Sequence, residues 1–211
     1  MFILASGSPR RRQLLVCLGL PFRVIVPDVE EEIPSASEHT PEEMAEALAR
    51  AKALSVAHRE GAGLVLAADT VVVHAGAILG KPRHAGEARE MLRRLRGESH
   101  RVITAVAVIP RGGRAALLRH PETEVTMRSY TDEEIEASIA RGDPFDKAGA
   151  YAIQDQAFHP VASYDGCYCN VVGLPLWTTV ELLRRAGFDI THTREAEMLP
   201  QCAACPLRPL L

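Results

Sequence analysis

Three consecutive arginines stand near the start of the chain, directly after the segment Ser6-Gly-Ser-Pro9. Ser8 suits the N-cap of a helix and Pro9 its first turn, so free backbone N–H groups and the positive end of the helix dipole would face back along the chain. Such a helix start binds anions, and guanidinium groups match the oxygens of a phosphate. The arginines are Arg10, Arg11 and Arg12. The spacing alone fits a capped surface helix with solvated arginines equally well.

A carboxylate and a lysine that could complete a phosphate site lie further along the chain. Asp69 and Thr70 follow the apolar run Gly63-Leu-Val-Leu-Ala-Ala68, at the carboxyl end of a predicted buried strand. Open α/β sheets bind their ligands at such strand ends. Lys81 stands between a glycine and a proline, which restrict its backbone. Taken singly, Asp69 could be a turn residue and Lys81 a solvated surface lysine.

Two further charged residues have an ordinary structural explanation and a chemical one. Lys52 lies inside a predicted helix, where a lysine is usually exposed, and Glu31 belongs to three glutamates at 30–32, a run that usually forms a solvated face. Phosphoryl and nucleotidyl transfer, however, needs cations around the phosphates, carboxylates for a divalent metal and a base that orients water. We therefore expect Mg²⁺, Mn²⁺ or a similar cation on Asp69 and Glu31, with the register open among the three glutamates.

Composition excludes several other classes of protein. The formal net charge of −3 gives no general attraction to nucleic acid or to an anionic membrane, and no apolar segment is long enough to span a membrane. The chain begins with an apolar strand and lacks the pattern of a signal peptide, so we expect a cytoplasmic protein. The glycine-rich motifs of P-loop and dinucleotide-binding proteins are absent, as are a nucleophile elbow and an HExxH zinc motif.

Apolar periodicity and turn signals predict an α/β fold in which helices flank a mixed central sheet. Residues 1–190 are expected to form a single domain, followed by a frayed tail over 191–211. Strands are predicted at 2–5, 22–26, 63–74, 78–79, 100–109, 115–130 and 150–153, and helices at 9–19, 41–58, 84–95, 131–142 and 174–186.

The five cysteines give a weak signal. Cys167 and Cys169 alternate in what is predicted to be a strand, without implying a bridge. Cys202 and Cys205 form a CxxC pair in the tail, but a zinc site needs two more ligands and no second CxxC is present. We interpret the pair as incidental or oxidisable, with metal or redox use as the alternative.

Several of these segments occur together in the order typical of one family. They are Ala5-Ser-Gly-Ser-Pro-Arg-Arg11, Ala67-Ala-Asp-Thr-Val71, Gly80-Lys-Pro82, Asp146-Lys-Ala-Gly-Ala-Tyr151 and Asn170-Val-Val-Gly-Leu-Pro175. In this order the chain resembles the Maf-family nucleotide pyrophosphatases over residues 2 to 187. The resemblance implies a two-lobed fold with a cleft, akin to inosine-triphosphate pyrophosphatase. It also implies metal-dependent hydrolysis of a nucleoside triphosphate to the monophosphate and pyrophosphate, usually by a homodimer.

Carried onto this sequence, the resemblance assigns roles to the candidate residues. Asp69 would activate water or hold the metal, together with Glu31, and Lys81 would act beside Asp69 in catalysis. Binding of the triphosphate substrate falls to the remaining polar residues. They are Ser8, Arg10, Arg11, Arg12, Lys52 and Thr70.

Substrate choice within the family depends on the segment that ends at Gln154. This segment, with Arg12 and Lys81, resembles the branch that acts on dTTP and UTP, including modified pyrimidine nucleotides. An amide can donate to O4 and accept from N3–H of thymine or uracil, whereas the cationic 7-methylguanine of the alternative substrate favours a glutamate. The residues Asp155-Gln-Ala-Phe158 depart from the glycine-containing stretch expected there. A nucleotide-binding regulator of cell division or septum formation is the alternative outside enzymes.

Overall fold

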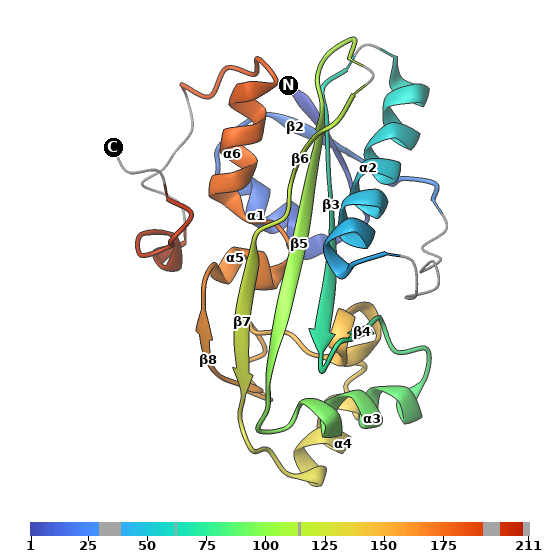
Figure 1. Ribbon diagram of the computed structural model, residues 1–211, viewed down its shortest axis with the longest axis vertical. Coiled ribbons are helices and arrows are strands. Elements are labelled where there is room, and N and C mark those ends of the chain that lie inside the picture. Colours follow the sequence, from blue (N-terminus) through green and yellow to red (C-terminus); the bar gives the residue numbers. More distant parts are fainter. Residues whose placement is uncertain (30–38, 62, 114, 192–198, 209–211) are drawn as a thin grey trace.

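The computed structural model describes residues 1–29, 39–61, 63–113, 115–191 and 199–208. Its centre is one mixed sheet in the order β2-β1-β3-β5-β7-β8, with β4 added to β3 and β6 added to β5 (Figure 1). The strands are β1 (Phe2–Ala5), β2 (Phe22–Ile25), β3 (Val65–His74), β4 (Ala77–Leu79), β5 (Ser99–Ile109), β6 (Leu117–Arg119), β7 (Glu122–Met127) and β8 (Val161–Asp165). Strands β2, β1 and β3 are parallel, and every pair from β3 to β8 is antiparallel.

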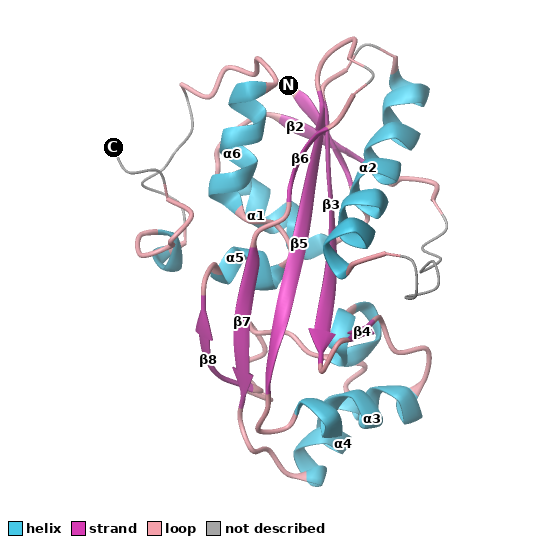
Figure 2. Cartoon of the chain, in the orientation of Figure 1, coloured by secondary structure: helices cyan, strands magenta, loops and turns pink. Residues whose placement is uncertain are grey.

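Helices cover both faces of this sheet (Figure 2). They are α1 (Pro9–Val16), α2 (Pro41–Glu60), α3 (Ala85–Leu95), α4 (Asp132–Ala140), α5 (Tyr168–Val172) and α6 (Leu176–Arg185), with short 3-10 turns η1 (Asp143–Asp146), η2 (Ala148–Ala150) and η4 (Pro200–Cys202). Helices α1, α5 and α6 pack in one apolar core and α2 packs in a second on the other face, whereas α3 and α4 belong to a third core near one end of the sheet. This confirms the predicted α/β fold with a mixed sheet.

Strand β3 positions the site, because its edge is uncovered in the middle. Strand β1 pairs with β3 only as far as Ala67, and β4 begins to pair with it at Val72. No other strand in the described part of the chain covers residues 68–71 on that edge. Successive side chains on a strand point to opposite faces, so Asp69 faces the α2 side and Thr70 faces the α1 side. Both can therefore reach one opening in the sheet.

Local signals for helix ends are confirmed. Ser8 accepts a hydrogen bond from the backbone N–H of Arg11, and Thr40 and Thr131 each form a capping box at the start of α2 and α4. The hairpin predicted at Gly76 is present between β3 and β4. Each of these features involves residues within four positions of one another, which is why the sequence specifies them.

The strand predicted at 63–74 is present as β3, which runs from Val65 through Asp69 to His74. Two other predicted strands differ in the structure. The run at 115–130 is divided into β6 and β7 at Pro121, which has no N–H to donate to a neighbouring strand. The short strand predicted at 150–153 is absent, because Gly149 and Ala150 adopt positive φ angles of 70° and 65°.

The cysteine-containing segments also differ from the prediction. Cys167 and Cys169 lie at the start of helix α5 instead of in a strand, because β8 ends at Asp165 and Gly166 turns the chain with φ of 129°. Residues 199–208 are packed against the core instead of frayed, with Cys202 and Cys205 buried. None of the described helices combines the length and apolarity needed to cross a membrane.

Candidate active site

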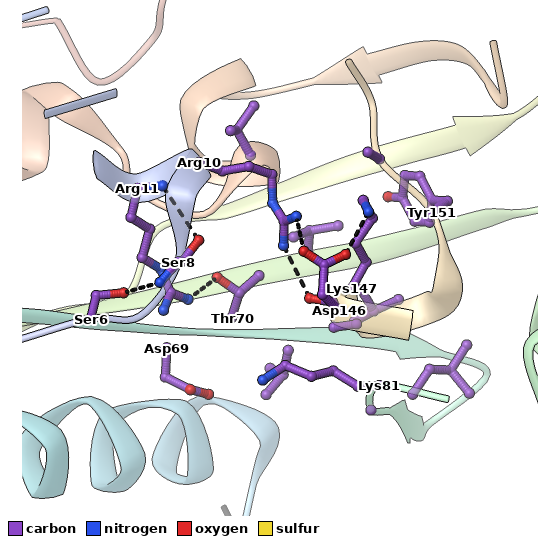
Figure 3. Close-up of a pocket in the computed structure, with 18 of the residues that line it drawn as sticks. Ser6, Ser8, Arg10, Arg11, Asp69, Thr70, Lys81, Asp146, Lys147 and Tyr151 are labelled. Atoms are coloured by element: carbon purple, nitrogen blue, oxygen red, sulfur yellow. Dashed lines mark hydrogen bonds and ion pairs between the residues drawn. The ribbon is translucent and has the colours of Figure 1, made fainter. Parts of the chain in front are cut away.

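A cavity of about 780 Å³ opens at the uncovered edge of β3 (Figure 3). Its walls come from the loop after β1, the start of α1, the middle of β3, the β4 segment and the turns η1 and η2. Its polar lining includes Ser6, Ser8, Arg10, Arg11, Lys52, Asp69, Thr70, Lys81, Asp146, Lys147, Tyr151 and Gln154. Four of the five segments that carry the family resemblance therefore contribute polar side chains to one cavity.

The loop before α1 presents hydroxyl and N–H groups to this cavity. Ser6 Oγ accepts from the N–H of Ser8 at 3.1 Å, and Ser8 Oγ accepts from the N–H of Arg11 at 3.4 Å. The positive end of the α1 dipole is directed the same way. This arrangement favours an anionic group near the two serines.

The Arg11 side chain is held by two segments far away in the sequence. Its Nε donates to the carbonyl oxygen of Gly173 at 2.8 Å, and its Nη2 donates to Thr70 Oγ1 at 3.0 Å. Thr70 is in turn 3.0 Å from the hydroxyl of Thr104 on β5. Asn170 fixes Thr104, because its side-chain and backbone oxygens accept from the backbone and hydroxyl of that residue. A guanidinium fixed in this way loses little freedom when it binds a phosphate.

Arg10 is held by Asp146. Its two terminal nitrogens lie 2.6 Å from Asp146 Oδ2 and 3.1 Å from the backbone oxygen of the same residue. Lys147 contacts the other carboxylate oxygen at 2.5 Å. Two cations thus share one carboxylate at the cavity wall, so this group carries a net positive charge that an anionic ligand would balance.

Asp69 and Lys52 form a buried ion pair on the α2 face of the sheet. Lys52 Nζ lies 2.6 Å from Asp69 Oδ1, and the two side chains are only 6% and 10% exposed. Burial of two charges is costly unless they are well paired, so each group depends on the other. Lys52, which a helix interior would usually expose, is thereby directed into the cavity beside the carboxylate.

The remaining predicted residues fall into three groups. Lys81 and Gln154 are exposed and line the cavity, and Figure 3 shows Lys81 and Asp69 on the opposite side of β3 from Arg10 and Arg11. Arg12 is exposed and does not line this cavity. Glu31, with its two neighbouring glutamates, lies outside the described residues. The structure therefore brings the candidate residues together except for Arg12 and the undescribed Glu31.

The segment after Gln154, which departs from the expected glycine-containing stretch, is braced by one aspartate. Asp155 Oδ1 accepts from the backbone N–H groups of Ala157 and Phe158, both at 2.9 Å. The other carboxylate oxygen of Asp155 lies 3.1 Å from Arg141. These contacts hold the backbone next to Gln154 in a fixed turn without the glycine.

Sequence analysis missed two parts of the site. The first is the hydroxyl of Thr104. The sequence indicated it only as a polar residue inside the apolar run that forms β5. The second is the buried pair of His100 and Tyr151, whose Nε2 and hydroxyl lie 2.7 Å apart behind the cavity wall. Burial, followed by repulsion from His74, lowers the pKa of His100 from 6.5 to about 4. The imidazole is therefore neutral at physiological pH and supports Tyr151 without adding charge.

This lowered pKa predicts a loss of stability in acid. The folded protein keeps His100 neutral down to about pH 4, whereas the unfolded chain takes up a proton below 6.5, so protonation favours unfolding in this window. At pH 5 this protonation of the unfolded chain lowers the free energy of unfolding by about 2 kcal/mol. The measurement is the free energy of unfolding in urea at pH 7 and at pH 5. We expect the decrease between the two pH values to be smaller for His100→Gln than for the wild type. An equal change in both proteins would contradict the assignment.

The fold and the site together define a class of protein: an α/β protein with a cation-lined cavity built for a polyphosphate, with one buried carboxylate beside it. Comparison with known proteins agrees. The family model described as Maf-like protein matches residues 1–186, and the chain belongs to this family.

Three relatives that are similar to this chain carry the same name. A protein of Thermomicrobium roseum named dTTP/UTP pyrophosphatase is 56% identical over 98% of this chain and 94% of its own length. Proteins with the same name from Symbiobacterium thermophilum and Pelotomaculum thermopropionicum are 47% and 45% identical over 89% of this chain and 95% and 97% of their own lengths. The match with the first relative extends past the family domain into the tail.

Proposed function

We propose that this protein hydrolyses dTTP, UTP and modified pyrimidine nucleotides to the monophosphate and pyrophosphate. The observation that carries the proposal is the placement of the buried Asp69–Lys52 pair in the same cavity as the fixed guanidinium groups of Arg10 and Arg11. The names of the relatives supply the substrate class. Binding of a nucleotide alone would not require a buried carboxylate facing the phosphates.

The residues around Asp69 fit a divalent cation. One carboxylate oxygen is 2.6 Å from Lys52, while the whole residue remains partly accessible from the cavity. Among the described residues, no three His, Cys, Asp or Glu side chains are arranged to hold a metal ion. A cation that relies on one or two protein carboxylates and takes its other ligands from substrate phosphates suits such a site, and Mg²⁺ and Mn²⁺ prefer oxygen ligands. Glu31 is proposed as the second carboxylate. Such an ion would neutralise charge that develops on the phosphates.

The reaction requires water to attack the α-phosphorus and the bond to the bridging oxygen of the β-phosphate to break. We assign the proton of the attacking water to Asp69, whose orientation Lys52 fixes. Arg10, Arg11 and Lys81 stabilise the negative charge on the phosphates and on the departing pyrophosphate. The pyrimidine monophosphate leaves with the new oxygen on its phosphorus. Ser8, with the start of α1, binds a terminal phosphate group.

Gln154 is proposed to bind the pyrimidine. It is exposed at the rim of the cavity, and it also lines a smaller cavity of about 200 Å³ that shares Arg10 with the first. The amide can pair with O4 and N3–H of uracil or thymine. Arg12, which lines neither cavity, is proposed only as a source of positive charge at the entrance.

Gln154→Glu is expected to weaken the use of dTTP and UTP. A carboxylate cannot donate to O4, and loss of one hydrogen bond in a recognition site costs about 1–3 kcal/mol, or about 5- to 150-fold in kcat/KM. The measurement is kcat/KM for dTTP, UTP and 7-methyl-GTP. Gln156→Glu, two residues further along an exposed stretch, is the matched control. Unchanged selectivity would remove Gln154 from the base site.

Pyrophosphate release from a panel of dTTP, UTP, CTP, 7-methyl-GTP and ITP, with Mg²⁺ or Mn²⁺, tests the whole proposal. Preference for 7-methyl-GTP would indicate the other branch of the family. Binding of these nucleotides without turnover would favour a regulator of cell division. A homodimer and a cytoplasmic location, both expected from the sequence, remain predictions that light scattering and cell fractionation would test.

A further inference from the structure

Four of the five cysteines converge although they come from two separate segments. Two stand at the start of α5 and two stand in the tail, more than thirty residues later. The sulfur of Cys169 lies 3.4 Å from that of Cys202. Cys167 interacts through its sulfur with Cys169 on one side and Cys205 on the other. The four sulfurs therefore form a row. Its members, in order, are Cys205, Cys167, Cys169 and Cys202.

The row is enclosed in the protein. The four residues are between 1% and 7% exposed. The backbone N–H groups of Cys169 and Asn170 lie near the sulfur of Cys167, and the N–H of Leu207 lies near that of Cys205. N–H donors directed at sulfur stabilise thiolates and are the usual surroundings of thiolate ligands to a metal. This is a second observation, independent of the clustering, that points to a metal ligand set.

The spacing of the cysteines agrees with that assignment. Cys202 and Cys205 form a C-x-x-C turn, with the N–H of Cys205 directed at the carbonyl of Cys202, and the pair on α5 supplies the two ligands that the tail lacks. As they stand, no three of the four sulfurs are arranged to hold a metal ion, so zinc binding requires the side chains to move. A tetrahedral site with Zn–S bonds of about 2.3 Å separates its sulfurs by about 3.8 Å, which is close to the 3.4 Å between the sulfurs of Cys169 and Cys202.

We propose that these four cysteines bind one zinc ion that fastens the C-terminal tail to helix α5. Four thiolates and no open position define a structural zinc site, because a catalytic site keeps one position for water or substrate. Besides its packing against the core, the tail is held by a hydrogen bond from Trp177 Nε1 to the carbonyl of Cys202 and by a contact of Arg208 with the Trp177 ring. The proposal is independent of the reaction.

The zinc site would also shape the smaller cavity. Leu199 and Gln201 of the tail line this cavity together with Arg10 and Gln154. Fastening the tail therefore fixes a surface beside the proposed pyrimidine site. Residues 170–173, which hold Arg11, follow directly after the two cysteines of α5.

The test is metal analysis of the full chain purified with a thiol reductant. We expect about one zinc ion per chain. The variants Cys205→Ser and Cys202→Ser are expected to lose it. Cys17→Ser is the matched control, because Cys17 lies outside the row and donates to the carbonyl of Gln13, and this variant should keep the ion.

A second measurement uses the wild-type protein and does not depend on the folding of a variant. Trp177 is the single tryptophan of the chain, so removal of the ion from wild-type protein by a chelator should shift its fluorescence to longer wavelength as the tail detaches. Addition of Co²⁺ should then produce the visible absorption of a tetrahedral thiolate site. Zinc-free protein with five reactive thiols would overturn the proposal. So would a mass lower by two hydrogen atoms, which indicates that one disulfide has formed.

Discussion

Replacing Asp69 by Asn is expected to lower kcat for dTTP by at least about two orders of magnitude, since a positioned base or metal ligand contributes about 10²–10⁴-fold. Asn has nearly the same shape but can neither accept the proton of the attacking water nor hold a divalent cation as a carboxylate does. The measurement is steady-state pyrophosphate release. Binding of dTTP, followed by calorimetry, should persist, because the arginines that contact the phosphates are unchanged.

The substitution also removes the carboxylate that pairs with the buried ammonium group of Lys52, which destabilises the fold. Melting temperatures of wild type and variant must therefore be compared, and activity must be measured well below both. Asp165→Asn on the exposed edge strand β8 is the matched control and should keep wild-type turnover. A folded Asp69→Asn protein that retains turnover within tenfold of wild type would exclude Asp69 as the catalytic carboxylate.

The second large effect is expected for Arg11→Ala. The substitution removes one guanidinium from the phosphate site and also removes the donor to Gly173 O and Thr70 Oγ1. Hydrogen bonds to charged groups contribute about 1.5–3 kcal/mol each, so kcat/KM for dTTP should fall about 10- to 150-fold. Progress curves over a range of dTTP concentrations give this ratio.

Arg12→Ala is the matched control for Arg11→Ala, since Arg12 is the next residue on the same helix but lines neither cavity. The substitution should lower kcat/KM for dTTP by at most a few-fold. This loss should become smaller with added salt, as expected for an exposed charge. Equal losses of kcat/KM in the two variants would mean that the arginines act only through the positive electrostatic potential around helix α1. Arg11 would then have no specific role.

Individual elements show where prediction from the sequence succeeds. The caps of α1, α2 and α4 were predicted because a side chain and the N–H it accepts from are three residues apart. The strand predicted at 150–153 was wrong because backbone conformations at Gly149 and Ala150 interrupt it. Helix α5 was missed because the alternation in Cys-Tyr-Cys is typical of a strand. The turn at Gly166 separates this segment from strand β8 and lets it form a helix.

By itself the sequence determined the chemical inventory: an anion-binding helix start, a carboxylate after a buried run, lysines and a pyrimidine-compatible amide. The tertiary structure alone decided how these residues meet. Lys52 reaches Asp69 because α2 crosses the face of β3, and Arg11 is fixed by Gly173, which is 162 positions away. Such contacts depend on which strand edge is left uncovered and on how helices pack on a sheet. Neither is encoded in the spacing of neighbouring residues. For the same reason the contacts among the four cysteines could not be predicted from the sequence.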